Sequence, residues 1–106
     1  MIVIKIGGGK SINIENIASD LVSQQEECII VHGGNYYLDE YAKLLGIKKN
    51  ILTSPTGLTS RYTSKKIIEL MYLTYAGLAN KKIVEVMQKV GINAIGLSGI
   101  DGKLII

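Results

Sequence analysis

Residues 2–8 read IVIKIGG, an apolar run that carries one lysine and then breaks into glycine. The run Ile2–Ile6 is typical of a strand buried on both faces, and Gly7–Gly9 follow it at once. A strand that ends in a glycine loop exposes several backbone N–H groups at one point, and together they can bind an anion. Lys5 adds a compact positive charge beside them. The stretch therefore predicts a phosphate site at the end of a strand.

The spacing of these glycines excludes two common phosphate-binding motifs. A Walker A loop needs Gly-Lys-Ser/Thr four residues after its first glycine, and the chain lacks that pattern here. The dinucleotide fingerprint needs a glycine three residues beyond Gly9, where Ile12 stands.

Length and composition indicate one small domain with enough apolar residues for a core. The chain has 106 residues, of which 47 % are hydrophobic, and no apolar stretch approaches the length of a membrane span. Its start runs directly into the first predicted strand, so we expect no signal peptide and a cytoplasmic location. The net charge is +3, but the basic residues are scattered, so we expect no binding to nucleic acid or membrane. Cys28 is predicted to be a buried, reduced thiol, and with His32 alone it makes no metal site.

The order strand, helix, strand predicts a right-handed unit with a parallel sheet. Asn13 is the expected N-cap of a helix from about Ile14 to Gln24, and Cys28–His32 is the second buried strand. The rest of the chain predicts a helix at about 37–45 that ends at Gly46, a loop over 47–62, and strands at 93–97 and 103–106.

A long helix is predicted to begin at Thr63 or Ser64 and to end at Gly91, with a bend or interruption at Gly77 and the Asn80-Lys81 step. Its first part, near residues 64–78, has two apolar faces rather than one. One face would cover the sheet of its own subunit. The other predicts a homodimer in which Met71, Tyr72 or Tyr75 is buried against a second chain.

The second strand also ends in a glycine turn, Gly33-Gly34. Neighbouring parallel strands would bring the two turns together at one edge of the sheet, where ligands of such folds bind. The glycines could serve only tight turns, but two matched turns beside Lys5 favour phosphate. Lys5 itself could extend to the surface without a role; its position two residues before the loop favours a role at the anion.

Two further side chains, Arg61 and His32, each allow a functional and a structural interpretation. Arg61 is the only arginine in a chain that otherwise uses lysine, which suits bidentate recognition of a carboxylate or phosphate, but it could equally be an ordinary surface residue. His32 is best explained as a residue packed under the glycine turn. A general base is the lesser reading, because no partner carboxylate is identifiable.

Three motifs in this order resemble the amino acid kinase family: Lys5-Ile6-Gly7-Gly8, His32-Gly33-Gly34 and Ser60-Arg61-Tyr62-Thr63. The segment 76–104 resembles the middle of acetylglutamate kinases. The run Ser54-Pro55-Thr56-Gly57 before SRYT is similar to the archaeal kinases of lysine and arginine biosynthesis. Those enzymes phosphorylate α-aminoadipate or glutamate while its amino group is attached to an acidic carrier protein.

The resemblance implies an α/β fold, an αβα sandwich with a mostly parallel sheet, and ATP-dependent phosphorylation of a carboxylate. It implies ATP and Mg²⁺ as cofactors, an amino acid substrate linked to a carrier protein, and dimerisation through the helix near 64–78. No metal ligand is assigned to this chain. The roles it implies are catalysis for Lys5, phosphate binding for Gly7, Gly8 and Gly9, and substrate binding for Gly33, Gly34, Asn35 and Arg61.

Two departures from the family pattern matter. Asn35 stands where the family usually has a third glycine, and family members are more than twice as long as this chain. Residues 1–106 are therefore expected to form a single incomplete domain, the N-terminal substrate-binding half without the nucleotide-binding half, and to be inactive alone. The alternative is a non-enzymatic homodimeric binding module or a degenerate remnant of such a kinase. A small-phosphate kinase is less favoured, because Arg61 within SRYT suits a carboxylate.

Overall fold

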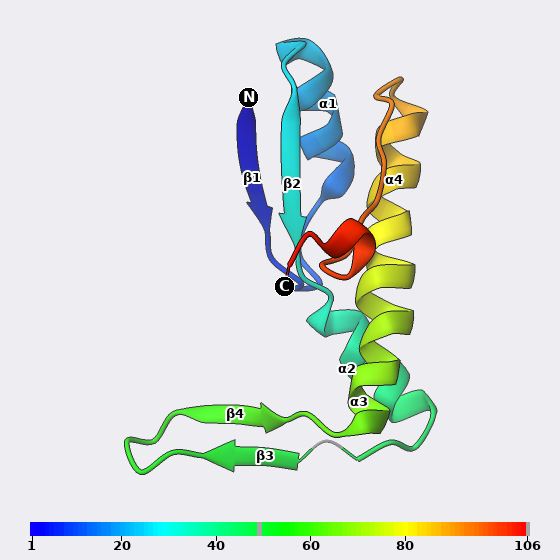
Figure 1. Cartoon of the computed structure of the whole chain (residues 1–106). Coiled ribbons are helices and arrows are strands. Elements are labelled where there is room, and N and C mark those ends of the chain that lie inside the picture. The colour runs from blue at the N-terminus through cyan, green and yellow to red at the C-terminus, as the bar shows by residue number, and fades with distance from the viewer. Residues whose placement is uncertain (49, 106) are drawn as a thin grey trace.

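The computed structural model describes residues 1–48 and 50–105. Within this part, residues 50–53 and 60–62 are described by their backbone alone. The elements in chain order are β1 (Ile2–Ile6), α1 (Ile14–Gln24), β2 (Cys28–His32), α2 (Asn35–Leu44), β3 (Asn50–Thr53), β4 (Thr59–Tyr62), α3 (Lys65–Met71), η1 (Tyr72–Ala79), α4 (Asn80–Lys89) and η2 (Asp101–Lys103) (Figure 1).

The first two strands lie parallel, as the order strand, helix, strand predicts. The register runs from Ile2 opposite Cys28 to Ile6 opposite His32. The Asn13 side chain caps α1 by accepting a hydrogen bond from the backbone N–H of Asn16 at 3.0 Å. The predicted α/β class, both strands and the first helix with its cap are therefore confirmed.

The main core lies on one face of these strands, where α1 and α4 pack over them. Ala18 and Leu21 of α1 meet Met87 of α4, and Ile4 and Ile30 of the strands pack against this cluster. On the opposite face Val3 is 65 % exposed, Ile29 49 % and Val31 48 %. The prediction of strands buried on both faces is thus wrong, because the described helices cover only one of them. Cys28 packs half-buried beside the core.

The segments α3, η1 and α4 form one continuous helical rod (Figure 1). Its winding changes part-way along its length. The Ser64 side chain caps α3, accepting from the N–H of Ile67 at 3.3 Å. Residues 72–79 form a π-helix, and the chain returns to α-helix at Asn80. The Thr74 hydroxyl donates to the Leu70 carbonyl at 2.8 Å, a bond that perturbs regular helix. The predicted interruption is therefore a wider stretch of helix rather than a bend.

A second, smaller cluster joins α2 to this rod. It consists of Leu38, Ala42 and Leu70, with Tyr75 and Ile47 packed beside them. Helix α2 begins at Asn35, before the predicted Tyr37, because the helix follows the second glycine turn directly. Gly46 has φ +68°, as expected for the residue that ends a helix.

Residues 47–62, predicted to be a loop, contain an antiparallel hairpin. The backbone of β3 pairs with that of β4, from Asn50 opposite Tyr62 to Thr53 opposite Thr59. The hairpin projects from the rest of the chain (Figure 1), and the radius of gyration is 15.7 Å, against about 13 Å for a compact chain of this length. Pro55 and Gly57 lie in the connecting turn, which is the part that the sequence signals described.

The strands predicted at 93–97 and 103–106 are absent from the described residues. Residues 92–98 run without a strand partner, held by side chains such as Gln88, whose Nε2 donates to the Ala94 carbonyl at 3.1 Å. Asp101–Lys103 is a short 3-10 helix around Gly102, whose φ is +58°. An apolar run becomes a strand only beside another strand, and the described chain offers none at that position. Ile106 lies outside the described residues.

Candidate functional site

The glycine turns that follow β1 and β2 touch each other. The Gly33 N–H donates to the Ile6 carbonyl at 3.1 Å, and the Tyr36 N–H donates to the Gly8 carbonyl at 2.9 Å. A Cβ on Gly8 would lie 2.6 Å from the backbone nitrogens of both Gly34 and Asn35. The contact is therefore possible only with glycine at position 8. The expectation that the two turns lie together is confirmed.

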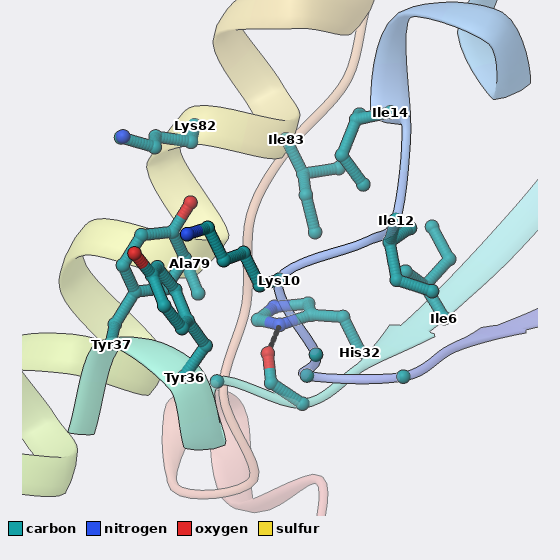
Figure 2. Close-up of a pocket in the computed structure, with 15 residues that line it drawn as sticks. Ile6, Lys10, Ile12, Ile14, His32, Tyr36, Tyr37, Ala79, Lys82 and Ile83 are labelled. Atoms are coloured by element: carbon teal, nitrogen blue, oxygen red, sulfur yellow. Dashed lines mark hydrogen bonds between the residues drawn. The ribbon is translucent and has the colours of Figure 1, made fainter. Parts of the chain in front are cut away.

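The two turns form one wall of an open cavity of about 100 Å³ (Figure 2). Its size suits a phosphoryl or carboxylate group rather than a whole nucleotide, because sites for larger ligands reach about 300 Å³ or more. None of the described residues that line it carries a carboxylate, and two are lysines. The lining residues are Ile6, Gly7, Gly8, Gly9, Lys10, Ile12, Ile14, His32, Gly33, Gly34, Tyr36, Tyr37, Ala79, Lys82 and Ile83.

Each lysine lies over the ring of one of two adjacent tyrosines. Lys10 Nζ is 6.0 Å from the centre of the Tyr36 ring, and Lys82 Nζ is 5.1 Å from that of Tyr37. The two rings meet edge to face, with their centres 5.5 Å apart. Cation–π attraction at this distance holds each ammonium group near its tyrosine ring. The two lysines give the lining of the cavity a positive charge, which suits an anion.

His32 lies beneath the second turn with both ring nitrogens in contact with a neighbour. Its Nδ1 is 2.9 Å from the Gly33 carbonyl oxygen, and its Nε2 is 3.0 Å from Nδ2 of Asn80. Since a carbonyl can only accept, Nδ1 carries the proton, and Nε2 accepts from the amide. The ring is thus a packed, hydrogen-bonded support of the turn.

The structure brings some of the predicted site residues together and leaves others apart. Gly7, Gly8, Gly9, Gly33 and Gly34 line the cavity. Three predicted site residues are not among the lining residues. Lys5 is exposed and lies opposite Val31, on the face of the strands that the helices leave open. Asn35 is the first residue of α2. Arg61 belongs to β4, and its side chain lies outside the described part.

Five polar residues in or next to the cavity were not predicted from sequence as site residues: Lys10, Tyr36, Tyr37, Asn80 and Lys82. Sequence position gave a signal for the first three, since each lies within three residues after a glycine turn. The other two are on α4, far along the chain, and only the packing of that helix brings Lys82 to the cavity lining and Asn80 to His32.

Among residues 1–48 and 50–105, no group of three or more His, Cys, Asp or Glu side chains could hold a metal ion. In the same part of the chain, no helix has the length and apolarity needed to cross a bilayer.

Residues 1–105 match the sequence profile of the Amino acid kinase family. The chain belongs to this family. It is 45 % identical over its whole length to the [LysW]-aminoadipate kinase of Thermus thermophilus, and 40 % identical over 98 % of its length to the enzyme of the same name from Deinococcus radiodurans. It is also 41 % identical to the [LysW]-aminoadipate/[LysW]-glutamate kinase of Saccharolobus solfataricus, again over its whole length.

The chain of this amino acid kinase family member corresponds to the N-terminal part of these curated relatives. It spans 40 % of the length of the Thermus and Saccharolobus proteins and 37 % of the Deinococcus protein. The glycine turns and the cavity thus lie in the part of the sequence that the chain shares with these relatives.

Proposed function

We propose that this chain is the N-terminal, substrate-binding part of a kinase that phosphorylates the side-chain carboxylate of carrier-linked α-aminoadipate or glutamate, or of N-acetylglutamate. The product is an acyl phosphate, and the reaction belongs to lysine or arginine biosynthesis in the cytoplasm. The names of the relatives from Thermus and Saccharolobus support aminoadipate and glutamate attached to LysW as substrates.

The observation that carries this proposal is the contact between the two glycine turns beside a cationic cavity. The turns come from neighbouring parallel strands, and Gly8 meets Gly34 and Asn35 backbone to backbone. Lys10 and Lys82 line the cavity, and no carboxylate is among its described lining residues. Such a site favours an anionic, phosphoryl-sized group, which the reaction provides in both its substrate and its product.

In the proposed reaction a carboxylate oxygen attacks the terminal phosphorus of ATP, and the bond from that phosphorus to the bridging oxygen breaks, releasing ADP. The glycine turns would donate backbone hydrogen bonds to the phosphoryl oxygens. Lys5 would offset the charge that develops there, reaching past the end of β1 from the open face of the strands. Asn35 and Arg61 would hold the substrate. Positioning and charge stabilisation supply nearly all of the rate in phosphoryl transfer.

The lining residues fit the phosphate of the nucleotide better than its metal ion. The backbone of the two glycine turns lines the cavity next to two lysines, which suits phosphate oxygens. Mg²⁺ prefers oxygen ligands, and the described lining residues offer no carboxylate. When bound, MgATP supplies the phosphoryl group. Most of its contacts would come from residues that correspond to the remainder of the longer relatives, so the chain alone is proposed to be inactive.

Trapping the product tests this proposal directly. The 106-residue chain is incubated with MgATP, hydroxylamine and either carrier-linked aminoadipate, carrier-linked glutamate or acetylglutamate, and hydroxamate is measured. We expect no turnover by this chain alone, and turnover when the C-terminal part of a relative such as the Thermus enzyme is added. Lys5→Met should abolish the complemented activity, whereas Lys89→Gln, far from the cavity, should not. Robust turnover without the added C-terminal part would contradict the proposal that the chain alone is inactive.

A homodimeric binding module is the second candidate, and an exposed apolar stripe on the rod favours it. Tyr72 is 54 % exposed, Leu73 65 % and Ile68 42 %. Tyr75 and Met71, also expected at a dimer interface, pack partly against α2 in their own subunit. Burying Tyr72 beside a second copy would remove this apolar surface from water. Sedimentation at micromolar concentration should show a dimer, and Tyr72→Glu should dissociate it, because an unpaired buried charge is costly. A monomeric wild-type chain would exclude the dimer.

A further inference from the structure

Asn80 is a buried polar residue at the point where three segments of the chain meet. It is the first residue of α4, is 5 % exposed, and reaches both the end of β2 and the segment after α4. A side chain at position 96 would overlap the Asn80 side-chain oxygen, so Gly96 is needed for this approach. Its surroundings therefore hold the amide in one place.

Every polar atom of the Asn80 side chain has a partner, and the partners define which way the amide faces. Its oxygen accepts from Lys81 Nζ at 3.3 Å. Its nitrogen has two N–H groups; one donates to the Leu97 carbonyl at 3.3 Å and the other to His32 Nε2 at 3.0 Å. A proton on Nε2 would face this N–H, donor against donor. The arrangement therefore requires Nε2 of the neutral ring to be bare.

The other ring nitrogen of His32, Nδ1, contacts the second glycine turn. With Nε2 bare, the proton of the neutral ring is on Nδ1, which donates to the Gly33 carbonyl at 2.9 Å (Figure 2). In a trans peptide the N–H of the next residue points away from that carbonyl. Fixing the Gly33 oxygen thus directs the Gly34 N–H away from the ring, and the Gly34 nitrogen lies 2.6 Å from the place of a Cβ on Gly8.

We propose that Asn80 is a positioning residue: it selects the Nδ1–H form of His32, and this form holds the Gly33–Gly34 peptide so that its N–H faces the anion site. The proposal rests on the proposed function only in treating the two glycine turns as that site. The ligand is a phosphoryl or carboxylate oxygen that accepts from the Gly34 N–H. Asn80 and His32 act through the peptide and do not touch the ligand.

The chain has a single histidine, so its ring nitrogens can be observed without ambiguity. Long-range ¹H–¹⁵N correlation spectra of the 106-residue chain are recorded at about pH 8, well above the usual pKa of histidine. We expect a protonated Nδ1 and a bare Nε2, the reverse of the form that histidine favours in water. In Asn80→Asp, which keeps the shape but can only accept, Nε2 should become protonated. The matched control is Asn16→Asp, on the exposed surface of α1, and it should leave the ring unchanged.

A second variant, Asn80→Ala, tests the effect on the turn. We expect the Gly34 amide resonance to shift and the Kd for inorganic phosphate to rise by about 2- to 10-fold, the value of one hydrogen bond. Asn16→Ala should change neither. If Asn80 had a purely structural role, Asn80→Ala would lower the free energy of unfolding without changing the His32 Nε2 resonance.

Three results would overturn the proposal: a protonated Nε2 in the wild-type chain, an unchanged ring in Asn80→Asp, or an unmoved Gly34 amide in Asn80→Ala. If the wild-type chain binds no phosphate, the proposed function fails, while the ring and amide resonances still decide the role of Asn80. The wild-type measurement alone can refute it, even if a variant does not fold.

Discussion

Replacing Gly8 with alanine should destabilise the chain more than any other single methyl group added to the first turn. The new Cβ would lie 2.6 Å from two backbone nitrogens, those of Gly34 and Asn35, and 3.1 Å from the Gly33 carbonyl carbon. Backbone atoms at the start of a helix cannot move aside as a flexible side chain can. The two turns must separate, and the Tyr36 N–H to Gly8 carbonyl bond, 2.9 Å long, lengthens or breaks.

The magnitude follows from these contacts. Overpacking costs about 1–3 kcal/mol, and a lost backbone hydrogen bond adds about 0.5–1.5 kcal/mol. Gly→Ala also stiffens the unfolded chain, which restores about 0.4–1 kcal/mol. The free energy of unfolding should therefore fall by about 0.5–4 kcal/mol, out of the ~5–15 kcal/mol of a small domain. With a urea m-value of about 2 kcal/mol/M, the midpoint falls by about 0.25–2 M.

Gly9→Ala is the matched control. A Cβ at this position would meet no atom within 4 Å, and the residue carries no positive φ. Its midpoint should equal that of the wild-type chain or lie slightly above it. The assay is urea unfolding followed by far-UV circular dichroism, with all three chains at one concentration. Equal midpoints for Gly8→Ala and Gly9→Ala would refute the close contact between the turns.

Three further predictions concern other parts of the chain. Hydrogen bonds from the Ser98 backbone N–H, at 2.6 Å, and hydroxyl, at 2.9 Å, lower the pKa of Asp101. The stability that these bonds contribute is present above the usual aspartate pKa near 3.9 and is lost as the pH falls through the lower pKa of the folded state. The Ser98 amide resonance should therefore titrate below about pH 4 and stay constant in Asp101→Asn. Asn13→Ala should cost about 0.5–2 kcal/mol in urea unfolding by removing the cap of α1, whereas Asn16→Ala, whose backbone alone takes part in that bond, should cost less than about 0.5 kcal/mol. Lys10→Gln and Lys82→Gln should each weaken phosphate binding in calorimetry and reduce its dependence on salt, because each removes a charge from the lining of the cavity. The control Lys89→Gln, on a lysine paired with Glu85 at 3.2 Å, should leave binding unchanged. Equal losses for all three variants would indicate only a general charge effect.

Local signals predicted the first part of the fold because its structure is set within short stretches. Asn13 carries the side-chain acceptor that a helix N-terminus needs, and Gly46 permits the positive φ at a helix end. Two apolar runs joined by one helix leave a parallel pair as the favoured arrangement. The two glycine turns then had to meet, so the sequence alone predicted that they share one edge of the sheet.

Tertiary structure decided what depends on distant partners. The runs 93–97 and 103–106 have strand-like composition, but a strand also needs a neighbour, and the described chain instead holds 92–98 by side chains. Burial of the strands on one face, and not two, follows from where α1 and α4 pack. Lys82 lines the cavity, and Asn80 reaches His32, only because the π-helical stretch and α4 bring them back beside the glycine turns. The sequence by itself determined the local turns, caps and strand order; the packing of the rod against the turns determined the chemistry of the cavity, because contacts between residues far apart in sequence leave no local pattern.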